Sequence, residues 1–186
     1  MNVLAISGSL RAESYNTGLA RAAARLAPEG VVVELYDGLG TLPLYDQDLD
    51  EGEGETPASV LELRGRIEAA DAILIVTPEY NGSIPGVLKN AIDWASARHR
   101  GSSLRNKTVA IAGVTTGQYG AIWAQQDLRK VLGISGARVI AGDLPVSRAN
   151  HVFDESGSLA DPFVAERLRE HVVALVAEAA PLAIAV

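Results

Sequence analysis

The chain of 186 residues contains no cysteine. Without a thiol it can form neither a disulfide nor a thiolate nucleophile, and it cannot bind a metal through cysteine. No run of about 18 consecutive apolar residues, the length that a membrane helix needs, occurs in the sequence. We therefore expect a protein that does not span a membrane.

Basic residues are also few. The chain has 16 lysines and arginines against 23 aspartates and glutamates, which gives a formal net charge of −7. This balance argues against general nucleic-acid binding, which uses basic surface stripes. The first residues, "MNVLAISGS", lack the basic start and the long apolar core of a signal peptide. We expect a cytoplasmic protein.

Several motifs of well-known sites are missing. Neither G-x-G-x-x-G nor G-x-x-x-x-G-K-[ST] occurs, so the common dinucleotide and P-loop sites have no support. There is no G-x-S-x-G nucleophile elbow. The three histidines, His99, His151 and His171, are far apart and form no H-E-x-x-H, so we expect no metal site. We expect His171 to be structural or solvent-facing, and His99 to lie either near a site or at a basic helix end.

The residues that are present alternate between apolar runs and helical patterns. The predicted strands are 2–7, 31–36, 72–77, 108–114 and a weaker 137–142, and the predicted helices are 15–27, 57–70, 84–97, 120–133 and 162–179. Near-continuous apolar runs are typical of parallel strands covered on both faces. Since right-handed crossovers leave few alternatives, the pattern predicts an open, doubly wound α/β sheet. No linker interrupts it, so we expect one domain over residues 1–186.

The sequence also indicates a helix cap at Thr56 and an acidic stretch that precedes the second helix. Thr56 is a plausible N-cap for the second helix, with Pro57 at its first position. The acidic stretch 37–56 is either a solvated loop or a lid or interface, and the sequence favours neither.

In such a sheet, ligands bind beyond the carboxyl ends of the strands. The loop after the first strand, "SGSLRAESYN", offers the hydroxyls of Ser9 and Ser14, the amide of Asn16, the cation of Arg11 and the free N–H groups of a helix start. These groups suit a single terminal phosphate. The alternative is that Ser14 or Asn16 only caps the helix and Arg11 is a solvated charge.

The loops after the third and fourth strands are the other candidates. In "TPEYNGSIPGVLKNAIDW", residues 77–94, Tyr80 could stack on a planar ring, although Pro, Asn and Gly also make an ordinary turn. In "VTTGQYGAIWAQ", residues 114–125, Gly117 and Gly120 permit close approach of a ligand to the backbone.

Taken together, "GSLRAESYN" and "PEYNGSIPGVLKNAIDW" resemble the NADPH-dependent FMN reductase family of flavodoxin-like flavoproteins. This family includes bacterial quinone and chromate reductases and azoreductase relatives. The resemblance implies a three-layer flavodoxin-like fold with a five-stranded parallel sheet of order 2-1-3-4-5. It also implies FMN as the cofactor and NADPH or NADH as the reductant.

The resemblance assigns cofactor-binding residues one by one. The FMN phosphate would be held by Ser9, Arg11, Ser14, Tyr15, Asn16 and Thr17; the ribityl chain and isoalloxazine would lie against Pro78, Glu79, Tyr80 and Asn81; the far edge of the flavin would face Thr115, Thr116 and Gly117. The sequence departs from the family at two places. The usual pair of glycines is Gly120 and Ala121 here, and a position often held by arginine is Trp123.

The implied activity is transfer of a hydride from NAD(P)H to the flavin, which then reduces a quinone, a flavin or a similar small acceptor. The flavin carries this chemistry, so no catalytic side chain is expected. Two alternatives remain open at this point: a flavodoxin-type electron carrier without nicotinamide activity, and a non-enzymatic flavodoxin-like binding domain.

We also expect a homodimer or homotetramer. The predicted interface uses the helix at 84–98 and the stretch 39–50, because Leu42, Leu44 and Tyr45 are apolar residues in an otherwise acidic loop.

Overall fold

The structure is a computed structural model that describes residues 1–51, 55–96 and 101–180. Its strands are β1 (Asn2–Ser7), β2 (Val32–Tyr36), β3 (Ala72–Val76), β4 (Thr108–Val114), β5 (Arg138–Val139) and β6 (Leu144–Val146). Its helices are α1 (Tyr15–Leu26), the 3-10 turn η1 (Gly38–Thr41), α2 (Gln47–Glu51), α3 (Ala58–Ala69), α4 (Gly86–Ala95), α5 (Ile122–Ile134), α6 (Ala149–Val152) and α7 (Pro162–Ala179).

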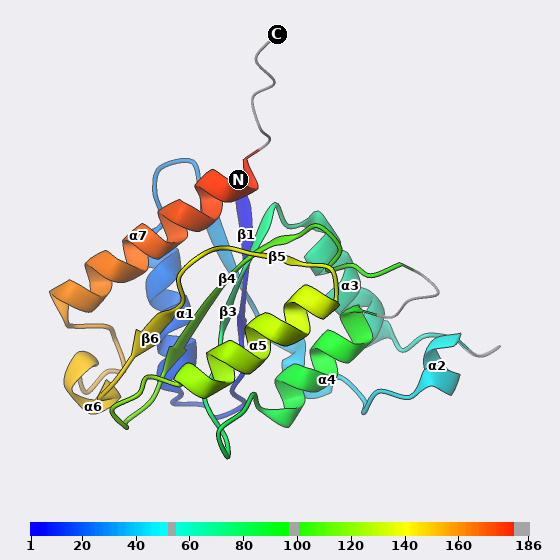
Figure 1. Ribbon diagram of the computed structural model, residues 1–186, viewed down its shortest axis with the longest axis horizontal. Helices are drawn as coiled ribbons and strands as arrows, with labels where there is room; N and C mark the ends of the chain where they lie inside the picture. Colours follow the sequence, from blue (N-terminus) through cyan, green and yellow to red (C-terminus); the bar gives the residue numbers. More distant parts are fainter. Residues whose placement is uncertain (52–54, 97–100, 181–186) are drawn as a thin grey trace, which may run out of the picture.

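The strands form one parallel sheet in the order β2-β1-β3-β4-β5, with β6 also paired to β4 (Figure 1). Ala5 pairs with Leu35 on one side and Leu74 on the other, so β1 lies between β2 and β3. The predicted order 2-1-3-4-5 is confirmed. The carboxyl ends of β1, β3 and β4 therefore lie next to one another.

Alternate residues of each strand face opposite layers of helices. Val3 and Ala5 belong to the core under α1 and α7, whereas Leu4 and Ile6 belong to the core under α3, α4 and α5 (Figure 1). Strand β4 is buried along its whole length. This explains why its sequence is a continuous apolar run, and the predicted three-layer fold is confirmed.

The fifth strand differs from the prediction of 137–142. It is only two residues long, and β6 takes its place beside the second half of β4. The interruption includes Gly142, whose φ of 78° is unfavourable for other residues in a strand. Arg129 of α5 holds the interrupted segment, since its guanidinium donates to the carbonyl of Ile140 at 2.9 Å and pairs with Asp143.

His171 of α7 is placed at the same interruption. Its Nε2 lies 2.9 Å from the carbonyl oxygen of Ile111 and donates to it. The carbonyl of Val109 accepts from Ile140 on this edge of β4, and residues of a parallel strand alternate between edges, so the Ile111 carbonyl faces the gap between β5 and β6. His171 thus replaces a missing strand hydrogen bond, in agreement with a structural role. His99 lies outside the described residues.

The predicted cap of the second helix is wrong. Pro57 is the N-cap of α3, and it provides no side-chain cap. Thr56 is buried, and its hydroxyl has no hydrogen-bond partner among the described residues. The other helix ends agree with the prediction to within one or two residues, apart from position 97, which lies outside the described residues.

The stretch 37–56 is not simply a solvated loop, because it contains η1 and α2. Asp50 is fully buried and forms an ion pair with the buried Arg64 at 2.8 Å. The carbonyl of Pro43 accepts from Trp94 Nε1 and Asn90 Nδ2, each at 2.8 Å. This segment therefore covers one side of α4 within the same chain.

Candidate functional site

The three candidate loops leave the carboxyl ends of β1, β3 and β4 and gather at the lower edge of the molecule in Figure 1. The first two loops touch near Gly8, whose N–H donates to the carbonyl of Val76 at 2.8 Å. A Cβ added at Gly8 would lie 3.2 Å from Pro78 and 3.1 Å from Leu88. Glycine at this position therefore lets the first loop pass closely over the second.

The first loop ends in a helix start with free donors. Ser14 is the N-cap of α1, and its Oγ accepts from the N–H of Asn16 at 3.2 Å. The N–H groups of Tyr15 and Thr17 belong to the first turn and have no acceptor within the helix. The positive end of the helix dipole adds to these donors. An anion such as a terminal phosphate fits this donor set.

Arg11 adds a cation at the same loop. Its Nη2 donates to the carbonyl of Glu13 at 2.6 Å, and its guanidinium lies 5.8 Å from the centre of the Tyr15 ring. Since the guanidinium has five donor hydrogens, one such bond leaves others for a ligand. The N–H of Arg11 donates to Ser9 Oγ at 3.3 Å, which holds the loop in a tight turn.

The side chains of Asn16, Thr17 and Tyr15 serve the fold. Asn16 is buried; its Nδ2 donates to the carbonyl of Val114 at 3.1 Å, and its Oδ1 accepts from the N–H of Val114 at 3.0 Å. The hydroxyl of Thr17 is 2.8 Å from that of Ser7. The Tyr15 ring packs against Phe153, with 5.2 Å between ring centres. These contacts leave the backbone of residues 15–17 as the part that faces a ligand.

The second loop is a tight hairpin. The N–H of Tyr80 donates to the carbonyl of Ser83 at 3.0 Å, and the N–H of Ser83 donates back at 3.1 Å. Asn81 and Gly82 have φ values of 53° and 74°, which is the left-handed pair that a two-residue type I′ turn requires. Pro78 before the hairpin is buried, and Tyr80 is exposed. The turn thus holds Tyr80 at the surface, two residues after the buried Pro78.

Glu79 has a role that the sequence did not reveal. Its Oε2 accepts from the N–H groups of Trp123 and Ala124, at 3.0 and 3.2 Å. The N-cap residue of α5 is Ala121, which provides no side-chain cap. A carboxylate at a helix start is favourable, so Glu79 supplies the cap from another loop and joins the second loop to α5. A helix start with alanine in place of Ser, Thr, Asp or Asn is the signal that could have indicated such a partner.

The third loop is closed by the segment after β6. The N–H of Arg148 donates to the carbonyl of Gly117 at 2.9 Å, and the N–H of Ala149 donates to that of Thr115 at 3.0 Å. Thr116 and Gly117 remain exposed. A Cβ at Gly120, where φ is 59°, would lie 2.7 Å from the N atom of Val146, so this position requires glycine. The sequence did not indicate the contribution of residues 148 and 149.

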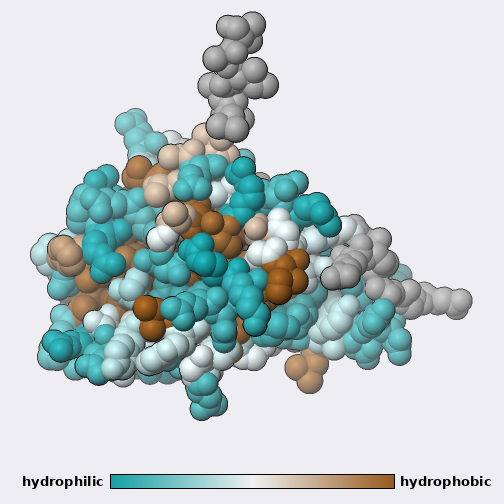
Figure 2. Space-filling model, in the orientation of Figure 1, coloured by the Kyte–Doolittle hydropathy of each residue, from teal (hydrophilic) through white to brown (hydrophobic). Residues whose placement is uncertain are grey.

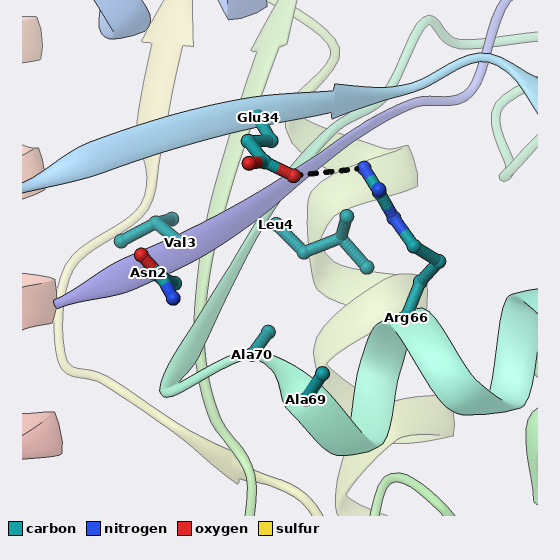
Figure 3. Close-up of a pocket in the computed structure, with 7 residues that line it drawn as sticks. All are labelled: Asn2, Val3, Leu4, Glu34, Arg66, Ala69 and Ala70. Carbon is teal, nitrogen blue, oxygen red and sulfur yellow. Dashed lines mark ion pairs between the residues drawn. The ribbon is translucent and has the colours of Figure 1, made fainter.

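A polar cavity lies beside the first of these loops, and a smaller groove lies far from all three. A cavity of about 290 Å³ borders the outer side of the first loop, between Arg11 and Arg21 on one side and residues 154–157 on the other. Hydrogen bonds from Ser156 and Ser158 lower the pKa of Asp154, so this wall carries a negative charge. A groove of about 100 Å³ lies at the opposite, amino end of the sheet, where Arg66 pairs with Glu34 at 3.1 Å (Figure 3). It is too small for a flavin and contains none of the candidate residues.

Within the described ranges, the structure contains no group of three or more histidine, aspartate and glutamate side chains placed to hold a metal ion. Nor does any described helix combine the length and the apolar character that a membrane crossing needs.

Comparisons with known proteins agree with this geometry. The family model of NADPH-dependent FMN reductase matches residues 1–151. The chain is 42% identical over 176 residues to an NAD(P)H-dependent FMN reductase of Pseudomonas aeruginosa, which covers 94% of this chain and 93% of the relative. It is 41% identical over 140 residues to a quinone reductase of Escherichia coli, which covers 75% of this chain and 73% of the relative.

A solved structure is also similar. The flavoenzyme NAD(P)H:(acceptor) oxidoreductase FerB from Paracoccus denitrificans superposes with a TM-score of 0.86 at 35% identity, over 96% of each chain. The resemblance that the loop motifs indicated is confirmed by the family model, the relatives and this structure. The chain belongs to the NADPH-dependent FMN reductase family.

Proposed function

We propose that this protein is an FMN-dependent NAD(P)H oxidoreductase that reduces a quinone, a flavin or a similar small acceptor. The observation that supports it most is the set of free backbone donors at the start of α1, in a loop that also packs at Gly8 against Pro78, the residue shortly before the hairpin that presents Tyr80. The FMN reductase and quinone reductase relatives support the same activity.

The residues that would hold FMN follow from this geometry. The phosphate would lie among Ser9, Arg11, Ser14 and the backbone from Tyr15 to Thr17; the ribityl chain and ring system would lie along Pro78, Glu79, Tyr80 and Asn81; Thr115, Thr116 and Gly117 would border the far edge. When bound, FMN supplies the redox chemistry by taking a hydride from NAD(P)H and giving two electrons to the acceptor.

The protein's own residues would bind the FMN and hold it in one orientation. Arg11 and the first-turn amides neutralise the phosphate charge, which the overall net charge of −7 would otherwise repel. Asn16 and Glu79 hold the three loops in one arrangement, Asn16 through β4 and Glu79 through α5. With a quinone as acceptor, the overall reaction is NAD(P)H + H⁺ + quinone giving NAD(P)⁺ + hydroquinone.

The absorbance spectrum of the purified protein, followed by anaerobic addition of NADPH and then NADH, tests the proposal. We expect one FMN per chain, bleached by at least one of the two nicotinamides. Bound FMN that neither nicotinamide bleaches would instead indicate an electron carrier. A colourless protein that also fails to bind added FMN would indicate a non-enzymatic binding domain.

The proposal includes three further points. The chain would act as a single FMN-binding domain over residues 1–186, it would form a homodimer or homotetramer, and it would work in the cytoplasm, where NAD(P)H is supplied.

A further inference from the structure

Gln125, near the start of α5, is a polar residue that is completely buried. Its Nε2 donates to the carbonyl oxygen of Gly120 at 2.7 Å, whereas its Oε1 has no hydrogen-bond partner among the described residues. A buried oxygen without a partner costs at least as much free energy as one hydrogen bond supplies. An apolar side chain of similar size would avoid this cost, so the stability of the fold does not by itself explain a glutamine at this position.

The amide of Gln125 lies where the second and third loops begin. A Cβ added at Gly113, in β4, would lie 3.1 Å from Gln125 Nε2 and 2.8 Å from the carbonyl oxygen of Thr77, the first residue after β3. Glycine at position 113 therefore leaves the space that the amide occupies beside the ends of β3 and β4. From there the amide reaches the end of the third loop at Gly120.

The turn that Gln125 holds at the end of the third loop is strained. Gly120 and Ala121 have φ values of 59° and 61°, and this left-handed conformation is unfavourable for a residue with a Cβ, such as Ala121. The Gln125 amide bonds to the turn itself, and the Glu79 carboxylate accepts from two N–H groups in the first turn of the helix that follows. These contacts keep the turn in a conformation that its own sequence does not favour.

We propose that Gln125 is a positioning residue for FMN that holds the third loop in the conformation that receives the flavin ring. This inference rests on the proposed function, in which Thr115, Thr116 and Gly117 border the far edge of the flavin. Backbone hydrogen bonds from the segment after β6 fix the start of this loop, and Gln125 fixes its end at Gly120. Since both ends are fixed, the loop is ordered before FMN binds, and binding does not have to supply the free energy that ordering costs.

The variant Gln125→Leu tests the proposal by fluorescence titration of the FMN-free protein with FMN. Loss of the bond to Gly120 should raise the Kd for FMN about fivefold to tenfold, the equivalent of one net hydrogen bond. The FMN-free variant should unfold at nearly the same urea concentration as the unmutated protein, because leucine removes the unpartnered oxygen together with the hydrogen bond. Gln126→Leu makes the same change at the next, exposed position; it is the matched control and should leave the Kd unchanged.

Riboflavin, which has the ring system and the ribityl chain of FMN but no phosphate, separates the two ends of the site. Gln125→Leu should weaken the binding of riboflavin and of FMN by the same factor, because the third loop borders the ring. Arg11→Ala should weaken the binding of FMN alone.

The strained turn provides a second check. Ala121→Gly removes the Cβ that disfavours the left-handed conformation, so the turn depends less on the amide. The double variant Gln125→Leu with Ala121→Gly should therefore recover part of the FMN affinity that Gln125→Leu loses.

An unchanged Kd for FMN in Gln125→Leu would overturn the proposal, and so would a loss confined to FMN or a double variant without recovery. A large fall in the urea midpoint of the FMN-free variant would also overturn it, by showing that Gln125 only stabilises the fold. Gln125→Met, with an unbranched side chain of similar length, makes the same test if leucine prevents folding. The proposed function fails on a different result, an unmutated protein that does not bind FMN or whose FMN neither nicotinamide bleaches.

Discussion

The side-chain amide of Asn16 joins helix α1 to strand β4. Both of its polar atoms are bonded to the backbone of Val114, 98 positions away in the sequence. A single residue therefore fixes the start of α1, where the phosphate donors lie, against the end of the strand that leads into the third loop. The geometry of the site depends on this buried contact as much as on the groups that would touch a ligand.

Replacing Asn16 with alanine should destabilise the protein. The change leaves the N–H and the carbonyl of Val114 buried without partners, and each such loss costs about 1–3 kcal/mol. We expect the free energy of unfolding to fall by about 3 kcal/mol in urea denaturation of the FMN-free protein. Gln126→Ala removes an exposed amide from α5 and serves as the control. If Asn16→Ala lowers the free energy of unfolding no more than the control does, the hydrogen bonds between Asn16 and Val114 do not stabilise the fold.

Replacing Arg11 with alanine should weaken FMN binding while the fold persists. The side chain is exposed and, among the residues that the structure describes, makes one hydrogen bond, to the carbonyl of Glu13, so its removal costs little stability. Hydrogen bonds to charged groups are worth about 1.5–3 kcal/mol, and we expect a loss of that size in FMN affinity, measured by quenching of flavin fluorescence. Arg25→Ala, at the other end of α1, is the control. Unchanged flavin retention in Arg11→Ala would mean that Arg11 is not a phosphate ligand.

At the scale of elements, the edge beside β4 is built from two short strands with a gap between them. Arg129 of α5 binds the carbonyl of Ile140 in the interrupted segment, and His171 of α7 binds the carbonyl of Ile111 that faces the gap. Helices on opposite faces of the sheet thus complete the hydrogen bonds that one continuous strand would have made.

His171 should make the stability depend on pH. Burial, the largest effect, lowers the pKa of His171 below its usual value of 6.5, so the native state disfavours the charged form. The unfolded chain then takes up the proton first as the pH falls. The stabilisation is therefore fully present above about pH 6.5 and is lost as the pH falls from there toward the lowered pKa.

The variant His171→Gln keeps a donor for Ile111 and removes the titration. When the pH is lowered from 7.5 to 5.5, we expect the free energy of unfolding to decrease more for the unmutated protein than for this variant. His151→Gln removes an exposed histidine and is the control. A difference that stays constant over this range would contradict a buried, neutral His171.

The order of the main strands and of the five longer helices was predictable because it follows from local patterns, whereas the short elements η1, α2, β6 and α6 were not predicted. Continuous apolar runs identified β1, β3 and β4, and the helix predicted over 162–179 has the bounds of α7. The divided fifth strand was not predictable, because the contacts that Arg129 and His171 make there join segments far apart in the sequence. The same reason applies to Glu79: its chemistry was visible in the sequence, but its pairing with the start of α5 was not. The loop motifs indicated the candidate site, whereas the side-chain roles of Asn16 and Thr17 became clear only in three dimensions.

At the scale of the whole molecule, the exposed hydrophobic residues are relevant to the oligomeric state. Part of the predicted interface is used within the chain, since Trp94 is buried and bonded to Pro43. On the face shown in Figure 2, hydrophobic residues lie in separate patches among hydrophilic ones. Leu44, in the segment between η1 and α2, is 84% exposed and belongs to the stretch 39–50 of the predicted interface, so its side chain is available for contact with a second copy.

We therefore expect light scattering at micromolar concentration to give the mass of a dimer or a tetramer. Leu44→Asp should shift the population toward the monomer, whereas Ile134→Asp, at an exposed position at the end of α5, should not. A monomeric unmutated protein would contradict the proposed assembly.

The central claim is that the loops after β1, β3 and β4 hold an FMN that NAD(P)H reduces and a quinone reoxidises. An anaerobic double-mixing stopped-flow experiment on the FMN-loaded protein measures both steps through the visible absorbance of the flavin. We predict that the absorbance disappears after mixing with NADPH or NADH and returns after mixing with 1,4-naphthoquinone. Absorbance that neither nicotinamide removes, in a protein that has bound FMN, would contradict the claim.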